Sequence, residues 1–257
     1  MMRHFGFATC LVAVAVAKSL IVTNNCPYTP VVSNTELDGG YTAKHGPRGW
    51  ESSPGDWRVV EVPSVWNGRI WARRGCAFSG ADLELGNCLA GACPRDGVEC
   101  DDHAMARDGN LVEMNLNDQG RGTDWYDVSA VPGFTLPITL VPGDSTCVSV
   151  HCTTDLNPTC PDDRLKILDD SGDTIGCKSA CFAGVNAGDN SPNCCSGSFL
   201  SHEACQPQMV DFYDFFKAGC PAAYAYPRDE DPTNVRPRVV FTCPKDVPWY
   251  RITFCGQ

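Results

Sequence analysis

The stretch Gly68-Arg-Ile-Trp-Ala-Arg-Arg-Gly-Cys76 shows, in a short space, the two patterns that run through the whole chain. Arg69, Trp71 and Arg73 alternate with apolar residues, which is the period-two pattern of a β-strand with two different faces. Glycines lie at both ends of the alternation, and a cysteine closes it. The stretch therefore predicts short strands that are separated by glycine or proline and joined by disulfide bonds.

The chain has 257 residues and 17 cysteines, and one cysteine differs from the others in its surroundings. Cys10 lies in the apolar run 5–17, which follows Arg3 and His4 and ends in Ala-Val-Ala. A basic start, an apolar centre too short to span a bilayer and small residues at the end are typical of a secretory signal peptide. We expect residues 1–17 to be removed after Ala17. The cysteines that remain are even in number, as an extracellular protein with eight disulfide bonds requires.

Metal binding is the alternative use of so many cysteines, but their spacing does not favour it. Zinc sites need paired Cys-x2-Cys or His-x3-His motifs, and here Cys177-x3-Cys181 stands alone among scattered single histidines. Adjacent cysteines rarely meet disulfide geometry, so Cys194 and Cys195 should bond to two different partners. We expect structural disulfides, no metal and no cofactor.

Charge and hydropathy exclude several classes of partner. With 20 basic and 31 acidic residues the formal net charge is −11, which argues against nucleic acid, anionic membranes and heparin-like ligands. Beyond the first segment no stretch approaches 18 apolar residues, so we expect no membrane span. A chain of this length can bury a real core, as one large all-β domain or two smaller ones, and a monomer is expected.

Alternating segments between glycines and prolines predict nine strands. They are 20–24, 57–63, 69–73, 111–117, 125–131, 134–141, 148–153, 239–243 and 250–255. One segment differs, because Met209, Phe212, Tyr213 and Phe216 recur at helical spacing and Gly219 follows as a stop signal. We therefore expect a mainly β protein with one amphipathic helix.

Several segments resemble the thaumatin-like family, which includes plant pathogenesis-related proteins and secreted relatives in fungi and animals. They are 25–28, 68–76, 124–129, 133–137, 176–181, 193–195, 215–217, 220–226 and 250–255. The resemblance covers nearly the whole chain after residue 17, and the cysteine count that remains there is that of the family. The chain is thus identified as a member, and the phrasing around Cys181 and Cys194 favours a fungal source.

The resemblance implies a disulfide connectivity that spacing alone cannot give. The implied pairs are Cys26–Cys255, Cys76–Cys88, Cys93–Cys100, Cys147–Cys243, Cys152–Cys220, Cys160–Cys177, Cys181–Cys194 and Cys195–Cys205. It also implies a flattened antiparallel β-sandwich over 18–74, 112–153 and 221–257. A small loop lobe would cover 75–111, and a helical disulfide-rich lobe would cover 154–220. An acidic cleft is expected between the sandwich and the helical lobe.

The family's cleft is lined by an arginine, a glutamate and three aspartates. In this sequence the matching residues are Arg69, Glu113, Asp127 and, at the last position, Glu230 or Asp231. Pro132 stands where the remaining aspartate is expected. Because one like charge is lost there, the other carboxyl groups should ionise more readily than in relatives that keep it.

Strand periodicity supports this cleft in part. Glu113 lies opposite the apolar face of its strand, and so does Asp127, although the pattern cannot show that these faces meet. Two carboxylates on facing strands could hydrolyse a glycosidic bond, one as general acid and the other as nucleophile or base. In the alternative interpretation both are ordinary solvent-facing charges.

Three functions follow from the resemblance. The favoured one is a secreted protein, extracellular or in the cell wall, that binds β-1,3-glucan or a related wall polymer in antifungal defence or wall remodelling. The second is a weak endo-β-1,3-glucanase with Glu113 and Asp127 as its catalytic pair. The third is a non-catalytic interaction protein, such as a hydrolase inhibitor.

Other motifs give weaker evidence for a functional site. Asp169-Asp-Ser-Gly-Asp173 is similar to a calcium loop, but it lacks the terminal glutamate and flanking helices of an EF-hand, so we expect a polar turn. Tryptophans could stack on sugar rings, although core or rim packing is the ordinary use of this residue. The tryptophans considered are Trp57, Trp66, Trp71, Trp125 and Trp249, and none is assigned as a sugar platform.

Overall fold

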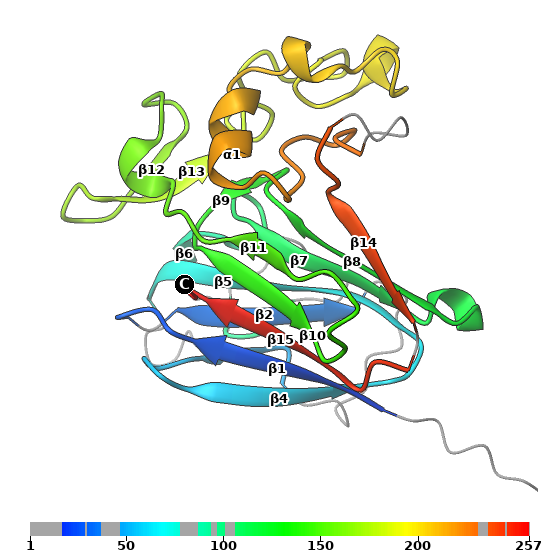
Figure 1. Cartoon of the computed structure of the whole chain (residues 1–257). Coiled ribbons are helices and arrows are strands. Elements are labelled where there is room, and N and C mark those ends of the chain that lie inside the picture. The colour runs from blue at the N-terminus through cyan, green and yellow to red at the C-terminus, as the bar shows by residue number, and fades with distance from the viewer. Residues whose placement is uncertain are drawn as a thin grey trace, which may run out of the picture.

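The computed structural model describes residues 17–28, 30–36, 47–77, 87–93, 97–100, 106–230, 236–244 and 246–256. Within these ranges the chain is mainly β, with one α-helix and several short 3₁₀ turns. Two large sheets pack face to face, and a small third sheet lies with the disulfide-rich part of the chain at one end (Figure 1). In the same ranges no helix is long and apolar enough to cross a membrane.

The five-stranded sheet has the order β11-β10-β15-β1-β4. Its strands are β1 (Lys18–Asn24), β4 (Trp57–Val62), β10 (Ile138–Pro142), β11 (Val150–Cys152) and β15 (Trp249–Phe254). The first strand, β1, pairs in parallel with the last strand, β15, and the other pairs are antiparallel. The two ends of the described chain are therefore joined inside one sheet.

The seven-stranded sheet has the order β14-β8-β7-β5-β2-β3, with β6 beside β5. Its strands are β2 (Val31–Glu36), β3 (Gly49–Glu51), β5 (Trp66–Ala77), β6 (Asn87–Ala90), β7 (Leu111–Leu116), β8 (Thr123–Ser129) and β14 (Val240–Pro244). The remaining elements are β9 (Gly133–Phe134), β12 (Lys166–Leu168), β13 (Thr174–Lys178) and helix α1 (Tyr213–Gly219). Strands β12, β13 and β9 form the third sheet.

The core lies between the two large sheets and follows the predicted alternation. In β15, Tyr250, Ile252 and Phe254 are buried whereas Arg251 is exposed. In β7 the alternate residues 112, 114 and 116 are buried in the same core. The predicted inward faces of these strands are confirmed, and the intervening residues of β7 are left on the outer face of the seven-stranded sheet.

A second, smaller core covers part of that outer face. Trp71 and Arg73 of β5 are fully buried beneath the described residues 91–93, 97–100 and 106–110. The Trp71 indole donates to the Gly91 carbonyl at 2.8 Å, and Arg73 donates to the Gly97 carbonyl at 2.8 Å. Arg69, on the same face of β5, lies beyond this cover and is only partly buried. One strand face thus supplies both a core and a surface site.

The structure differs from two of the sequence predictions. The predicted strand 134–141 is two strands, β9 and β10, because the Thr135 and Leu136 N–H groups donate to the Asn110 side chain at 2.9 and 3.2 Å, and Pro137 has no N–H to donate. The predicted helix is shorter than its apolar pattern, because Phe212 has a left-handed backbone with φ of 62° and α1 begins only after it. Met209 lies in a separate 3₁₀ turn, Pro207–Met209.

Eight disulfide bonds join the cysteines from Cys26 onward. They are Cys26–Cys255, Cys76–Cys88, Cys93–Cys100, Cys147–Cys243, Cys152–Cys220, Cys160–Cys177, Cys181–Cys194 and Cys195–Cys205, the pairs that the resemblance implies. The first spans 229 residues and links the two ends of the fold. The expected signal peptide lies outside the described residues, apart from Ala17, which directly precedes β1.

A buried ion pair joins the two large sheets at one end. The Lys18 ammonium of β1 pairs with the Asp124 carboxylate of β8, and both side chains are almost fully buried. Asp124 also accepts from the Tyr250 hydroxyl at 2.6 Å and from the Asn117 N–H at 2.7 Å. These contacts leave the carboxylate fully paired, as a buried charge requires.

The folded protein should contain no free thiol from Cys26 onward. Titration with a thiol reagent under denaturing, non-reducing conditions is expected to give zero thiols per chain, or one if Cys10 is retained. Two or more would contradict the disulfide pairing. Reduction should abolish resistance to heat and protease together, because each bridge contributes about 2–4 kcal/mol to the free energy of unfolding.

Breaking the Lys18–Asp124 pair from one side should be costly. Lys18→Met leaves a carboxylate buried without its cation, so we expect the free energy of unfolding in urea to fall by about 3–5 kcal/mol. The double variant Lys18→Met/Asp124→Asn should lose less than Lys18→Met alone. A double variant that is less stable than the single one would show that the charge pairing is not the main contribution.

Candidate functional site

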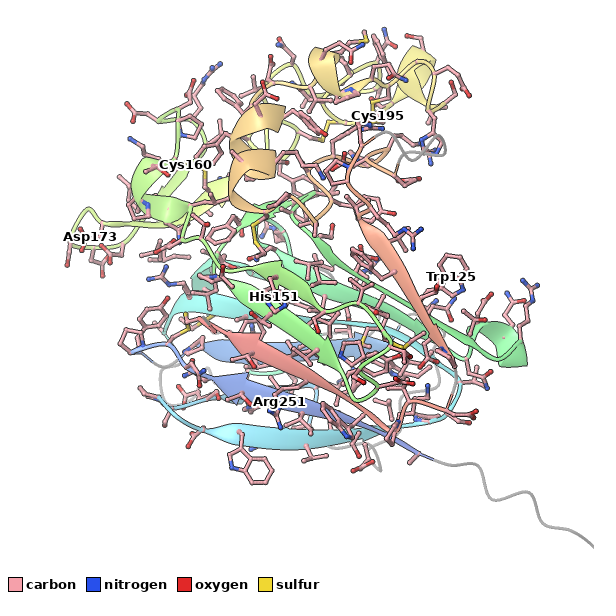
Figure 2. The ribbon with its side chains drawn as sticks, viewed as in Figure 1. Trp125, His151, Cys160, Asp173, Cys195 and Arg251 are labelled. Carbon is pink, nitrogen blue, oxygen red and sulfur yellow. A yellow bond between two sulfur atoms is a disulfide. The ribbon has the colours of Figure 1, made fainter. Side chains whose placement is uncertain are left out.

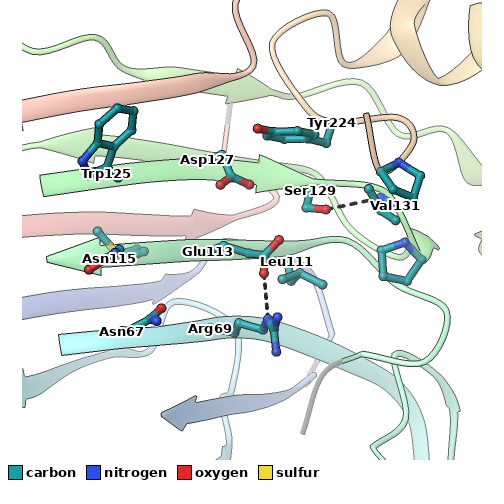
Figure 3. Close-up of a pocket in the computed structure, with 13 residues that line it drawn as sticks. Asn67, Arg69, Leu111, Glu113, Asn115, Trp125, Asp127, Ser129, Val131 and Tyr224 are labelled. Carbon is teal, nitrogen blue, oxygen red and sulfur yellow. Dashed lines mark hydrogen bonds and ion pairs between the residues drawn. The ribbon is translucent and has the colours of Figure 1, made fainter. Parts of the chain in front are cut away.

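Strand register brings the three predicted cleft residues side by side. Arg69 of β5 lies directly opposite Glu113 of β7, and Glu113 lies directly opposite Asp127 of β8. The three side chains form a line across the outer face of the seven-stranded sheet (Figure 3). Sequence periodicity predicted that each of them lies on the face of its strand opposite the apolar face. The register adds that the three residues are direct neighbours on adjacent strands.

An open cleft of about 390 Å³ surrounds this line. Its floor is the sheet, where Asn67, Asn115, Trp125 and Ser129 also line it, and Tyr224 lies on a wall outside the sheet. The Tyr224 segment is held against β8 by two backbone hydrogen bonds, from the Tyr224 N–H to the Val128 carbonyl at 2.9 Å and from the Ala130 N–H to the Tyr224 carbonyl at 2.7 Å. The cleft therefore lies between the sandwich and the segment that follows Cys220.

Arg69 and Glu113 form an ion pair in the cleft. The Arg69 Nε lies 2.7 Å from Glu113 Oε1, and both side chains are partly exposed. A charge-assisted hydrogen bond of this length orients the Glu113 carboxylate along the sheet. Glu113 therefore presents a fixed negative charge beside Asp127.

The carboxyl group of Asp127, unlike that of Glu113, has an oxygen atom that is enclosed and, within the described chain, unpaired. Its Oδ1 atom is enclosed and has no hydrogen-bond partner among the residues that the structure describes. Burial raises the pKa of this carboxyl group well above its usual range, the Glu113 charge raises the pKa further, and Arg69 opposes both. Glu230 is near enough to add to the rise. The site thus sets a carboxylate that is bonded to an arginine beside a carboxyl group whose pKa is raised.

Pro132 lines the cleft where the family's further aspartate was expected. The loss of that acid was expected to let the remaining carboxyl groups ionise more readily. The pKa of Asp127 is nevertheless raised, and the first cause is burial, which a count of like charges does not include. The comparison with relatives that keep the aspartate stays a prediction.

The acidic run at 229–231 divides between different roles. Glu230 lies beside the cleft, where its Oε1 is 3.1 Å from the His202 Nε2. Asp231 lies outside the described residues. Asp229 is fully buried and accepts from the Ala225 N–H at 2.8 Å, while Lys217 and Arg236 pair with it at 2.8 and 3.1 Å. Asp229 therefore holds the cleft wall in place and does not face the cleft.

Two cleft residues were not assigned from the sequence. Trp125 is 42% exposed at one end of the cleft, whereas no tryptophan was assigned as a sugar platform from the sequence. Tyr224 lies over Asp127, and burial together with the nearby carboxylates raises the pKa of its hydroxyl, which therefore stays a hydrogen-bond donor (Figure 3). Trp125 lies two positions before Asp127 on β8, so strand alternation could have predicted that it shares the cleft face.

The 169–173 segment is a turn between β12 and β13. The Asp169 carboxylate accepts from the Ser171 and Asp173 N–H groups at 2.9 and 3.0 Å, so it stabilises its own loop. Over the part of the chain that the structure describes, no group of three or more histidine, cysteine, aspartate or glutamate side chains could hold a metal ion.

The fold agrees with the comparisons to known proteins. The Thaumatin family model matches residues 24–256, so the chain belongs to the thaumatin family. Thaumatin-like protein 1 of Arabidopsis thaliana is 36% identical over 245 residues, which cover 92% of this chain and 85% of the relative. Pathogenesis-related thaumatin-like protein 3.4 of Cryptomeria japonica is 38% identical over 237 residues, 92% of this chain and 81% of the relative.

One relative carries the name of an enzyme. Glucan endo-1,3-beta-glucosidase of Prunus avium is 32% identical over 241 residues, which cover 93% of this chain and 91% of the relative. These three relatives are plant proteins, and the fungal source suggested by the sequence stays a prediction. The chain is therefore a pathogenesis-related type of thaumatin-like protein, and its disulfide content fits a secreted protein.

The raised pKa of Asp127 predicts a specific pH dependence of stability. When folding raises the pKa of a carboxyl group, stability falls as the pH rises from the unfolded-state pKa toward the folded-state pKa, because the unfolded state ionises more easily. Asp127→Asn removes this loss. The free energy of unfolding of the variant, measured relative to wild type, should therefore increase as the pH rises above the unfolded-state pKa of about 4.

Glu113→Gln serves as the matched control, because it removes the other carboxylate of the same row. It breaks the ion pair with Arg69, so it should not become more stable than wild type at neutral pH. An Asp127→Asn variant whose stability relative to wild type does not change with pH would show that Asp127 ionises normally.

Proposed function

We propose that this protein is secreted and binds β-1,3-glucan or a related cell-wall polysaccharide in its acidic cleft, in antifungal defence or wall remodelling. The observation that carries the proposal is the line of Arg69, Glu113 and Asp127 in an open cleft. Carboxyl, carboxylate and guanidinium groups at strand spacing offer donors and acceptors to the hydroxyl groups of successive sugars. The half-exposed Trp125 at the end of the line adds an apolar surface for a sugar ring.

The choice of a neutral polymer follows from the charges. Arg69, the cation of the row, is already paired with Glu113, and the net charge of −11 disfavours anionic ligands. The cleft is open along the sheet, which suits a chain more than a small enclosed ligand. The relative named glucan endo-1,3-beta-glucosidase supports β-1,3-glucan as the first polymer to test.

Hydrolysis is a second candidate, favoured by the different protonation of the two acids. Asp127 would protonate the leaving oxygen, and ionised Glu113 would act as nucleophile or base. Directly opposite residues on paired strands have Cβ atoms about 4.5–5.5 Å apart, which favours the spacing of a retaining mechanism. Burial supplies the raised pKa that such an acid needs.

Paired measurements on insoluble β-1,3-glucan test both candidates. Retention and reducing-end release are measured for wild type, Glu113→Gln and Asp127→Asn. If the cleft is catalytic, both variants should lose release by at least about a hundredfold, while nearly isosteric Asp127→Asn keeps most of its retention. If the cleft only binds, wild type should show retention without release, and both variants should be retained less.

Three outcomes would count against parts of the proposal. Wild-type release that survives both substitutions would exclude these carboxylates as the catalytic pair. Wild-type retention unchanged in both variants would exclude the cleft as the glucan site. No retention of wild type on any cell-wall polymer would leave the interaction-protein hypothesis.

A further inference from the structure

A second groove lies on the far side of the sandwich from the acidic cleft. It is on the outer face of the five-stranded sheet, has a volume of about 450 Å³ and is lined by Ile21, Thr23, Asn25, Trp57, Arg251 and Thr253. We call it the Trp57 groove. Figure 2 labels Arg251 on this sheet, below helix α1 and the disulfide-rich part of the chain.

Strand register builds the Trp57 groove from three neighbouring strands. Trp57 of β4 lies directly opposite Thr23 of β1, and Thr23 lies directly opposite Thr253 of β15. The row therefore runs from an aromatic ring to two hydroxyl groups at the spacing of adjacent strands, about 4.8 Å. Two residues away along the strands, Ile21 and Arg251 form the next row on the same face.

The Trp57 side chain is not used by the core. It is 67% exposed, whereas Trp66 and Trp71 are 1% and 0% exposed. Val59, two residues further along the same face of β4, is 40% exposed. An exposed aromatic ring at the end of an ordered polar row offers an apolar surface on which a sugar ring can stack.

The polar groups of the groove are available for a ligand. Over the described ranges, the side chains of Thr23, Asn25 and Thr253 have no hydrogen-bond partner in the protein. The Arg251 guanidinium stacks on the Trp249 ring at 5.5 Å, which orients it without occupying its N–H groups. The groove thus combines one exposed ring with fixed donors and acceptors.

We propose that the Trp57 groove is a second polysaccharide-binding site that takes a neutral glycan chain. The Trp57 ring would stack on the apolar face of a pyranose, and Thr23, Thr253 and Asn25 would bond the hydroxyl groups of the next sugars. One cation in the groove is too few for a polyanion, and the net charge of −11 disfavours one as well. A protein partner would require a wider apolar centre than one indole and its neighbouring valine.

The two sites would act on different polymer chains. The cleft and the Trp57 groove lie on opposite outer faces of the sandwich, so a single stiff chain cannot occupy both. One molecule would instead bridge two chains, and simultaneous binding on a solid polymer would strengthen retention beyond that of either site. The inference adds a second binding site on another face of the protein. Only the bridging of two polymer chains depends on the proposed function of the cleft.

The test measures retention on insoluble β-1,3-glucan, cellulose and chitin, and aggregation of suspended β-1,3-glucan particles. Trp57→Ala is made alone and together with the cleft pair Glu113→Gln/Asp127→Asn. In the cleft-altered protein, Trp57→Ala should weaken the remaining retention about tenfold, a loss of about 1.4 kcal/mol. With the cleft intact, Trp57→Ala should reduce retention on β-1,3-glucan to that of the cleft alone and abolish particle aggregation.

Control variants separate binding from folding. Trp57→Phe keeps a ring and should restore most of the retention that Trp57→Ala loses. Leu200→Ala removes another exposed apolar side chain, 60% exposed and outside both sites, and should behave as wild type. Thermal unfolding should be similar for all of these groove variants, because Trp57 lies on an edge strand outside the core.

The outcomes for the groove and for the cleft can be told apart. The inference is overturned if Trp57→Ala changes neither retention nor aggregation, both in the wild-type protein and in the protein with the altered cleft, on all three polymers. The cleft is then judged by its own variants. If retention requires Trp57 and is unaffected by the cleft pair, the groove is a polysaccharide site and the proposed function of the cleft fails. If wild type is retained on none of the polymers, both fail.

Discussion

The register of β5, β7 and β8 is the constraint on which the rest of the molecule depends. Successive residues of a strand face opposite sides, so a slip of one position would exchange core and surface along the whole strand. The apolar residues of β7 and β8 must face the five-stranded sheet, where they fill the main core. Their partners in the alternation are then forced onto the outer face. Arg69, Glu113 and Asp127 therefore meet in one line because packing on the other side of the sheet leaves them no alternative.

The cleft also needs a second wall, and cross-links far from the carboxylates provide it. Cys220, at the end of α1, is bonded to Cys152 of β11, which belongs to the other large sheet. The chain that leaves Cys220 is thus anchored before it reaches Tyr224, where two backbone hydrogen bonds attach it to β8. Without these anchors, the segment from Cys220 to Tyr224 would lose more conformational entropy when it packs against the sheet. The disulfide-rich part therefore limits the motion of the wall and keeps the cleft open.

Sequence reasoning was accurate where one periodicity decided the structure, and it was incomplete where distant segments decided it. The inward residues of β7, β8 and β15 followed from alternation alone. Strands β3 and β12 have only three residues each and exist because a longer neighbour pairs with them, which no local pattern can show. The break between β9 and β10 depends on Asn110, a residue 25 positions away from Thr135, whose N–H it accepts. For the site, the resemblance supplied the residue types, but the burial that raises the pKa of Asp127 is a property of the assembled walls.

The distribution of buried charge separates support from function in this protein. Asp124 and Asp229 are both fully buried, and each is neutralised by cations and surrounded by hydrogen-bond donors. Asp127 lies on the same sheet as Asp124, yet the nearest cation, Arg69, is already bonded to Glu113. Burial raises the pKa of a carboxyl group placed in this way, and a ligand hydroxyl that bonded to its enclosed oxygen would give that unpaired atom a partner. The fold thus compensates the acids that hold it together and leaves one acid uncompensated in the cleft, where a bound sugar would supply the missing partner.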